Sequence, residues 1–319
     1  MRHNRKLLAA TALDVDFGFV TEFAGECANA ETKYKEPAGI TLPTVEHNRK
    51  IDKTGECGEG LSYVLDDGTL TVSGTGKIAD NAFRDVSAIR KVVINEGVSD
   101  IGVMAFSDTW NIVGISFPKS VKTIGDAAFS VCRSLESVSI PEGVASIGEK
   151  SFSCCFTMNE LSIPNTLTDI GKDAFYGCVS LERIVVSDNN PVYDSRKGCN
   201  ALIDSKSNEL LVGCRSTVIP DGITTIGKYA YTGIEGLTDV VVPDSVKVIG
   251  KSAFYFCVDL KNVYIPSSVV SIGENAFSEN NKNLEIHTKK DSYAWNYALE
   301  HKIAKLDTGK TDELTNRKK

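Results

Sequence analysis

The sequence predicts a β-rich solenoid of about eight stacked copies of one 23-residue unit, joined by short helical turns. Three registers predict it: an Ile-Gly pair, an aromatic residue five positions after its isoleucine, and a proline after an alternating segment. The isoleucines are Ile101, Ile124, Ile147, Ile170, Ile226, Ile249 and Ile272. The aromatic residues are Phe106, Phe129, Phe152, Phe175, Tyr231, Phe254 and Phe277. A unit this short cannot bury its apolar residues alone, so the copies must share one core.

The copy around Pro141 shows how one unit is expected to fold. Residues 137–140, SVSI, alternate between polar and apolar, as in a short strand with one apolar face. Pro141 ends this strand, because proline has no N–H for a central ladder. Residues 144–147 form a second short extended piece. Residues 126–129, DAAF, predict a brief helical turn that begins with Asp126 as its cap.

The segments around the repeats predict specialised ends and one interruption. Asp66-Asp67-Gly68 between two alternating segments is typical of a β-hairpin, which we expect to cap the N-terminal end. The proline register fails at Ser187, and a hairpin turning near 205–208 predicts a β-hairpin insert. The predicted parts are a damaged signal peptide (1–30), a linker (31–55), the hairpin cap (56–76), the solenoid (77–290) with its insert (187–217), a C-terminal helical cap (291–305) and a polar tail (306–319).

The first thirty residues resemble an export signal. A basic start is followed by the apolar stretch LLAATALDVDFGFV and by Ala28-Asn29-Ala30, an A-x-A cleavage pattern. Asp14 and Asp16 lie inside the apolar stretch, where charge weakens insertion, so a disordered N-terminus is the alternative. Export predicts an extracellular or cell-surface location. No later segment is apolar for about 18 residues, so no transmembrane helix is expected.

Composition and motifs argue against several function classes. The net charge of −7 disfavours nucleic acid and anionic membranes as partners. The four histidines all lie near the ends of the chain, which disfavours a central histidine-based catalytic or zinc site. Common enzyme motifs, including G-x-S-x-G, H-E-x-x-H and the phosphate-binding loop, do not occur. We therefore predict no enzyme activity, no cofactor and no metal site.

Four cysteines share one place in the period, three residues after the aromatic. They are Cys132, Cys155, Cys178 and Cys257. Val86, Thr109 and Ile234 occupy the same place in other copies, which indicates a small buried packing position. The period does not fix Cys154, which we expect near the surface.

Cys199 and Cys214 flank the predicted insert hairpin. A hairpin centred between Lys206 and Ser207 places them opposite each other, where a disulfide can form in an exported protein. Two small core residues are the alternative.

The repeating motifs I-G-x-x-A-F and L-x-x-V-x-I-P resemble the BspA-type leucine-rich repeat, a 23-residue variant found in bacterial surface and secreted proteins. They stand in this sequence as Ile124 to Phe129 and Leu135 to Pro141, and the resemblance covers residues 77–290. It implies a leucine-rich-repeat solenoid that acts as an adhesin or interaction protein. The implied partners are surface or matrix proteins, or glycans, of a host or neighbouring cell. The family offers no catalytic residues to carry over.

The residues that alternate with the core positions point outward and form a predicted binding face. They are Ser116, Ser137, Ser139, Glu160, Ser162, Arg183, Asp239, Asn262 and Tyr264. The face is small and polar, which fits a protein or glycan better than a small-molecule pocket. A merely solvated face, in a structural or spacer module of the cell envelope, is the alternative. Tyr193 with residues 188–190 of the insert forms a second candidate patch.

Overall fold

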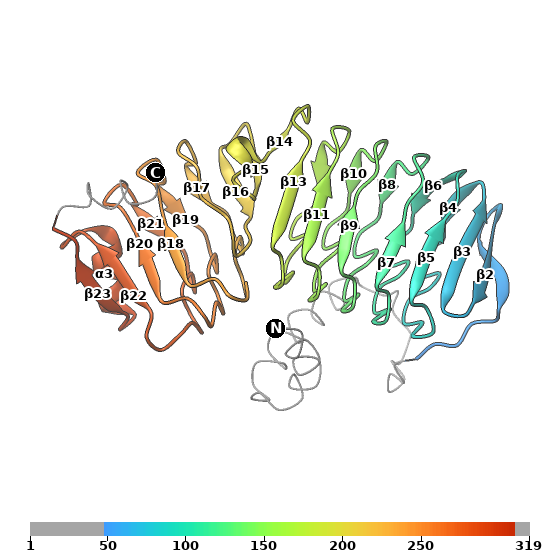
Figure 1. Ribbon diagram of the computed structural model, residues 1–319, viewed down its shortest axis with the longest axis horizontal. Helices are drawn as coiled ribbons and strands as arrows, with labels where there is room; N and C mark the ends of the chain where they lie inside the picture. Colours follow the sequence, from blue (N-terminus) through green and yellow to red (C-terminus); the bar gives the residue numbers. More distant parts are fainter. Residues whose placement is uncertain (1–47, 310–319) are drawn as a thin grey trace, which may run out of the picture. The chain divides into compact units, whose positions relative to one another are not determined.

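The protein is a stack of coils whose strands form two sheets along its length (Figure 1). This computed structural model describes residues 48–309, so the predicted signal peptide, most of the linker and most of the tail lie outside the described residues. The solenoid expected from the 23-residue period is confirmed.

The longer strands form one sheet, here called the long-strand sheet, in three hydrogen-bonded groups. The first is β1 (Thr54–Gly58), β2 (Leu61–Asp66), β3 (Thr69–Gly74), β5 (Lys91–Ile94) and β7 (Gly114–Ser116). The second is β9 (Ser137–Ser139), β11 (Glu160–Ile163) and β13 (Arg183–Val186). The third is β18 (Asp239–Val241), β20 (Asn262–Tyr264), β22 (Glu285–Thr288) and β23 (Ala304–Asp307). Neighbouring coils pair in parallel at a 23-residue offset, as Glu160 does with Ser137 and Arg183.

The shorter strands form the short-strand sheet on the other side of each coil. Its first group is β4 (Gly76–Ile78), β6 (Val98–Ile101), β8 (Thr123–Ile124), β10 (Ser146–Ile147) and β12 (Asp169–Ile170). Its second group is β14 (Tyr193–Asp194), β15 (Leu202–Asp204), β16 (Glu209–Val212), β17 (Thr225–Ile226), β19 (Val248–Ile249) and β21 (Ser271–Ile272). Three of these, β14 to β16, belong to the insert, together with the short 3-10 helix η1 (Arg196–Gly198).

The core is a file of aromatic rings that runs through the stack. Phe83, Phe106, Phe129, Phe152 and Phe175 stack in sequence with ring centroids 5.0 to 5.8 Å apart. A second file begins at Tyr231 and continues through Phe254 and Phe277, at 4.9 and 5.2 Å. The repeated aromatic position therefore builds the shared core that the period predicted.

The segment between the Ile-Gly pair and the cysteine position, such as 148–155, is called here the arm of a coil. Three N–H groups of this arm, on Lys150, Phe152 and Cys154, donate to carbonyls of the next coil at 2.7 to 3.0 Å. Lys150 and Cys154 have the left-handed φ values of 55° and 58°. The arms are thus ladders of turns, in place of the expected helical turns, and their N–H groups point toward the next coil.

Two expectations about the arms are corrected by this ladder. Asp126 does not cap its own turn, because its Oδ1 accepts from the N–H of Glu149 in the next coil at 2.7 Å. Cys154 is fully buried instead of lying near the surface, and its N–H is the third ladder donor of its arm. Its left-handed conformation recurs at Val131 and Phe256, so side chains of several kinds share this position.

The cysteines three residues after the aromatic are buried, as predicted. The thiols of Cys132, Cys155 and Cys178 each donate to the carbonyl of the aromatic residue in the previous coil, at 3.3 Å. Cys257 does the same to Tyr231 at 3.0 Å. This position therefore combines small volume with a donor for a buried carbonyl.

The glycine of each Ile-Gly pair allows neighbouring coils to approach closely. A Cβ at Gly148 would lie 2.3 Å from Asp126 Oδ1 and 2.4 Å from the Asp126 nitrogen. A Cβ at Gly171 would lie 2.2 Å from the carbonyl carbon of Gly148. The backbones stack too tightly here for any side chain.

A hairpin lies at one end of the described stack and a short helix at the other. β2 and β3 form an antiparallel hairpin that turns at Asp67 and Gly68, and β3 pairs in parallel with β5. At the other end, the helix α3 (Tyr293–Glu300) begins with Ser292, whose hydroxyl accepts from the N–H of Trp295. Its buried residues are Ala294, Tyr297 and Ala298.

The insert hairpin is present, but its register differs from the expected one. Asp204 faces Glu209 as expected, whereas a bulge between Leu202 and Ile203 places Leu202 opposite Val212. Cys214 therefore lies against Asn200, with its thiol 3.3 Å from the Asn200 carbonyl. Cys199 and Cys214 are both buried free thiols in this structure, as in the alternative of two small core residues, and the possible disulfide is not formed in it.

The insert also divides the stack, and the junction between arm 171–178 and arm 227–234 is called here the seam. On the short-strand side, β14, β15 and β16 lie between the two halves (Figure 1). On the opposite side the halves meet directly, because the N–H of Glu235 donates to the Val179 carbonyl at 2.9 Å. The insert is therefore a wedge: three of its strands separate the halves on the short-strand side, and it leaves the halves in direct contact at Val179 and Glu235.

Candidate functional site

The outward side of the long-strand sheet carries all of the predicted binding residues. Residues 23 apart stand beside each other on it, in rows that cross β9, β11 and β13 and again β18, β20 and β22. The insert separates these two groups of strands. The predicted residues thus fall into two sets, one on each side of the insert.

The set before the insert is flat and formed by small side chains. Ser116, Ser137 and Ser139 are exposed, and Ser162 is half-buried beside them. A Cβ at Gly114 would have no neighbour within 4 Å, so the surface is open there. The only long side chains of this predicted set, Arg183 and Glu160, form an ion pair at 2.7 Å.

The set after the insert forms a connected group of polar and aromatic side chains, here called the polar cluster: Asp239, Asn262, Tyr264, Glu285 and His287. The Asn262 amide donates to Asp239 Oδ1 at 2.9 Å, and Asn262 Oδ1 lies 3.0 Å from His287 Nε2. His287 Nε2 is also 3.3 Å from Glu285 Oε2. The Tyr264 and His287 rings stack, with centroids 4.4 Å apart.

These contacts fix how the polar cluster can bind. Nε2 of His287 faces two acceptor oxygens, so it carries a proton and donates. The oxygen of the Asn262 amide accepts from this nitrogen, and the NH₂ group of the same amide donates to Asp239. The ring stack and the hydrogen bonds hold neighbouring side chains in one arrangement before any ligand arrives. A cluster ordered in this way loses less conformational entropy on binding than free side chains would.

Three members of the polar cluster were predicted from the sequence and two were missed. Asp239, Asn262 and Tyr264 were predicted, whereas Glu285 and His287 were not, because the proline that marks the other strands is absent after β22. The signal was nevertheless available, since Glu285 and His287 follow Asn262 and Tyr264 by one period.

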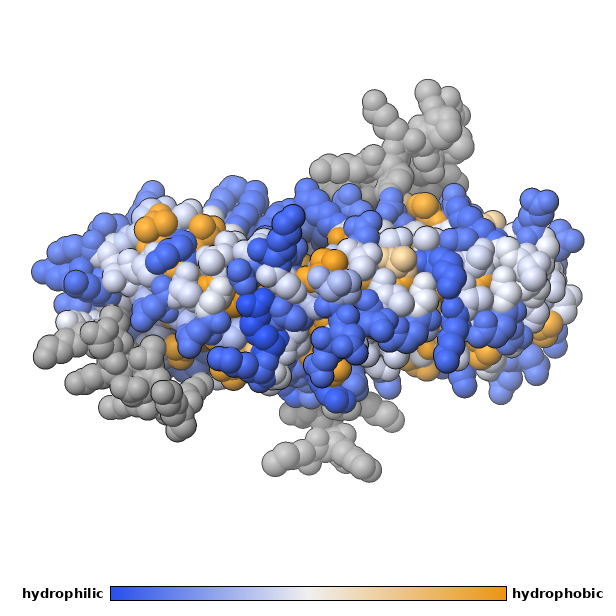
Figure 2. Space-filling view, turned by 90° about the horizontal axis from the view of Figure 1, so that it is seen from above, coloured by the Kyte–Doolittle hydropathy of each residue, from blue (hydrophilic) through white to orange (hydrophobic). Residues whose placement is uncertain are grey.

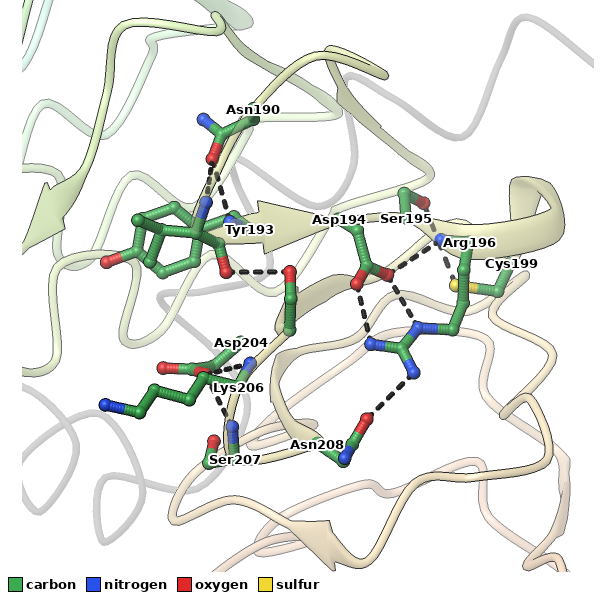
Figure 3. A network of polar contacts seen from close by, with 12 residues as sticks. Asn190, Tyr193, Asp194, Ser195, Arg196, Cys199, Asp204, Lys206, Ser207 and Asn208 are labelled. Carbon is green, nitrogen blue, oxygen red and sulfur yellow. Dashed lines mark hydrogen bonds and ion pairs between the residues drawn. The ribbon is translucent and has the colours of Figure 1, made fainter.

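The second candidate patch, in the insert, is occupied by its own hydrogen bonds (Figure 3). The Asn190 amide donates to the carbonyls of Pro164 and Leu167, while its oxygen accepts from the N–H groups of Val192 and Tyr193. Arg196 donates to both carboxylate oxygens of Asp194 at 2.6 and 2.8 Å, and to Asn208 at 2.9 Å. These side chains hold the insert together, so the polar cluster is the better binding candidate.

The surface features of the described residues suit contact with another molecule in water. The side shown in Figure 2 is mostly hydrophilic, with apolar residues scattered singly among polar ones. Within residues 48–309 no helix is long and apolar enough to cross a membrane. The same residues contain no group of three His, Cys, Asp or Glu side chains placed to hold a metal ion.

Comparison with known families gives a match over most of the chain. Residues 76–196 and 207–308 match the BspA type Leucine rich repeat region, in six copies. The unmatched stretch between them, 197–206, includes β15 of the insert, whereas β16 lies in the second match. No curated protein matches the sequence.

Two of the solved structures that match this chain share its fold. A leucine-rich repeat protein from Eubacterium ventriosum is 24% identical, with a TM-score of 0.57 over 75% of this chain and 72% of that one. A leucine-rich repeat protein from Bacteroides ovatus is 23% identical, with a TM-score of 0.50 over 75% of this chain and 70% of that one. At this identity the likeness shows the fold alone.

Proposed function

The chain belongs to the BspA-type leucine-rich repeat family, and on this premise we propose that it is an exported or cell-surface protein that binds a protein or glycan through its long-strand sheet. Binding without chemistry is the function that the residues support best. The observation that carries the proposal is the polar cluster, in which two carboxylates, an amide and the Tyr264 ring lie on one sheet, with the buried His287 ring stacked against Tyr264. Export is supported by the signal-like pattern of residues 1–30.

The polar cluster suits a glycan or a polar protein surface for chemical reasons. Carboxylate and amide oxygens accept hydrogen bonds from hydroxyl and amide groups, and the half-buried Tyr264 ring offers apolar area beside them. Interfaces place most of their binding energy in a few such residues near the centre of the contact. The flat serine surface before the insert would then add area and little energy.

Binding to a glycan array and to a panel of extracellular-matrix proteins tests the proposal. Once a ligand gives saturable binding, Tyr264→Ala should weaken it about tenfold or more, because Tyr264 is a central aromatic contact. Ser139→Ala, on the flat set, is the matched control and should leave the affinity unchanged. Equal effects of the two changes would contradict the assignment to the polar cluster.

Fractionation of the producing cells tests the location. We expect the protein outside the cytoplasm, with a mature N-terminus after Ala30. Export without saturable binding to any ligand would favour the alternative function, a structural or spacer module of the envelope. Retention in the cytoplasm would contradict the export proposal.

A further inference from the structure

The seam encloses a cavity of about 250 Å³ that no part of the proposed binding face uses. One wall is the arm 171–178, and the other is formed by arm 227–234 together with Leu211 to Gly213 of the insert. The lining also includes the apolar side chains of Phe175, Leu181 and Leu202. A single water occupies about 30 Å³ of liquid, so this space is large enough for part of a ligand.

The first wall presents three backbone donors that the fold leaves without acceptors. In the preceding coil, the N–H groups of Lys150, Phe152 and Cys154 donate to the next arm. The corresponding residues at the seam are Asp173, Phe175 and Gly177, and their N–H groups have no acceptor among the described residues. Asp173 and Gly177 keep the left-handed φ values of 57° and 74°.

The opposite wall accounts for the missing partners. In a regular coil, the residues at the places of Lys228, Ala230 and Thr232 would accept these N–H groups. At the seam the insert intervenes, and the Ala230 carbonyl accepts from Gly213 at 2.8 Å instead. Phe175 and Gly177 are buried residues, and a buried backbone N–H is costly unless it is bonded to something.

The direction and shape of the cavity indicate the kind of group that would bond to these donors. The arms that are followed directly by a regular coil pair this same row of N–H groups with main-chain carbonyl oxygens, so the row suits peptide oxygens. The halves bond to each other where the Glu235 N–H meets the Val179 carbonyl, so a bound chain cannot run between them at that point. A chain end fits such a closing space, and a C-terminal carboxylate with the carbonyl before it offers three acceptors to the three donors.

We propose that the seam cavity binds the C-terminal carboxylate of a short peptide whose last side chain is apolar. The carboxylate lies on the N–H groups of Asp173, Phe175 and Gly177, and the side chain contacts Phe175 and Leu211. The positive and negative side chains that line the cavity are equal in number. Lys228 is paired with Asp173 at 3.6 Å, and Lys172 and Glu209 carry one charge of each sign. Recognition therefore depends on the backbone donors.

Nuclear magnetic resonance titration of the ¹⁵N-labelled full chain tests this site directly. The probe is acetyl-Gly-Ala-Val with a free carboxylate. The amide signals of Asp173, Phe175 and Gly177 should shift and saturate together, whereas those of the matched donors Lys150, Phe152 and Cys154 should not. Shifts spread equally over both arms, or none at the seam, would overturn the proposal.

Two further ligands identify the recognised group. The same peptide with a C-terminal amide should bind about tenfold more weakly or worse, because hydrogen bonds to a charged acceptor are the stronger ones. Equal affinity of amide and acid would overturn the carboxylate assignment. Isobutyrate carries the carboxylate without the peptide, and its binding as tightly as the peptide would overturn the peptide assignment.

A matched pair of variants locates the site without disturbing the core. Lys228 and Lys251 hold the same place in consecutive coils, and only Lys228 lines the cavity. Lys228→Glu should weaken the free-acid peptide about fivefold, because a repulsive charge replaces an attractive one near the carboxylate. Lys251→Glu should leave it unchanged. Equal effects of the two variants would overturn the location.

Discussion

The regular coils and the seam share the same arm pattern and differ in the coil that is stacked on it. Between arms 125–132 and 148–155 each ladder N–H meets a carbonyl and each ring meets a ring. At the seam the ladder stops, the two ring files end at Phe175 and Tyr231, and a cavity remains. Each arm thus supplies the N–H donors and one ring of an interface, and the next coil must supply the carbonyl acceptors and the second ring.

The largest changes in the free energy of unfolding are expected from substitutions in the row of stacked aromatic rings. Phe129 is stacked between Phe106 and Phe152 at 5.0 and 5.3 Å, whereas Phe175 has one such stack, at 5.8 Å. Phe129→Ala should lower the free energy of unfolding by about 3–5 kcal/mol. Phe175→Ala should cost about 0.5–1.5 kcal/mol less, since one aromatic pair is missing and a cavity is already present. Urea unfolding followed by circular dichroism measures both, and equal losses would contradict the contrast.

The glycine row should give the next largest effect. Gly148→Ala places a Cβ against the Asp126 backbone, so it should lower stability by about 1–3 kcal/mol through overpacking. Gly114→Ala meets open space on the long-strand sheet and is the control, expected within about 0.5 kcal/mol of the natural chain. Thermal unfolding of both variants checks this, and a neutral Gly148→Ala would show that the coils are not held so close.

The Asn200 side chain joins the insert to β13 of the preceding coil. Its side chain accepts from the Ile184 N–H at 2.6 Å and donates to the Glu182 carbonyl at 2.7 Å, in place of a neighbouring strand. Asn200→Ala should cost about 1–3 kcal/mol and speed hydrogen exchange at Ile184, because that N–H loses its acceptor. The exposed neighbour Asn189→Ala should change neither quantity. Unchanged exchange at Ile184 would show that Asn200 does not hold the insert to β13.

The smallest expected difference lies in the cysteine row. Burial raises the pKa of Cys178 at the seam and of Cys257 in a regular coil from 9.0 to about 12. The folded protein holds both thiols neutral, so stability from each is full below pH 9 and declines as the pH rises toward 12, at up to about 1.4 kcal/mol per pH unit. Cys178→Val and Cys257→Val should reduce this alkaline loss equally. A smaller effect for Cys178→Val would mean that water in the cavity reaches its thiol.

Much of this fold can be predicted from the spacing of a few residue types. The Ile-Gly and aromatic registers predict the coils, and the place of Cys155 three residues after Phe152 predicts its burial. The left-handed arm residues were not predictable in the same way, because Lys150, Cys154 and Phe256 share a backbone conformation and little chemistry. The bulge at Leu202 was missed for a related reason, since hairpin residues of either register would alternate alike.

The candidate sites were predictable only in part. Outward strand residues are identified by alternation, so Asn262 and Tyr264 could be named, and the period would also have named His287. Their mutual contacts could not be predicted, because side-chain rotamers decide which neighbours bond. The donors at Asp173, Phe175 and Gly177 belong to the backbone and have no residue signature at all.

The one-way arm ladder also bears on how such a chain can change its length in evolution. Each regular coil presents N–H groups on one side and carbonyls on the other, and it bonds only to the coils beside it. A gene duplication or deletion of 23 codons within the regular stack would therefore join compatible faces and leave the rest of the protein intact. The same event across the insert would separate Asn200 from Ile184. Related chains should accordingly differ by whole coils on either side of a retained insert.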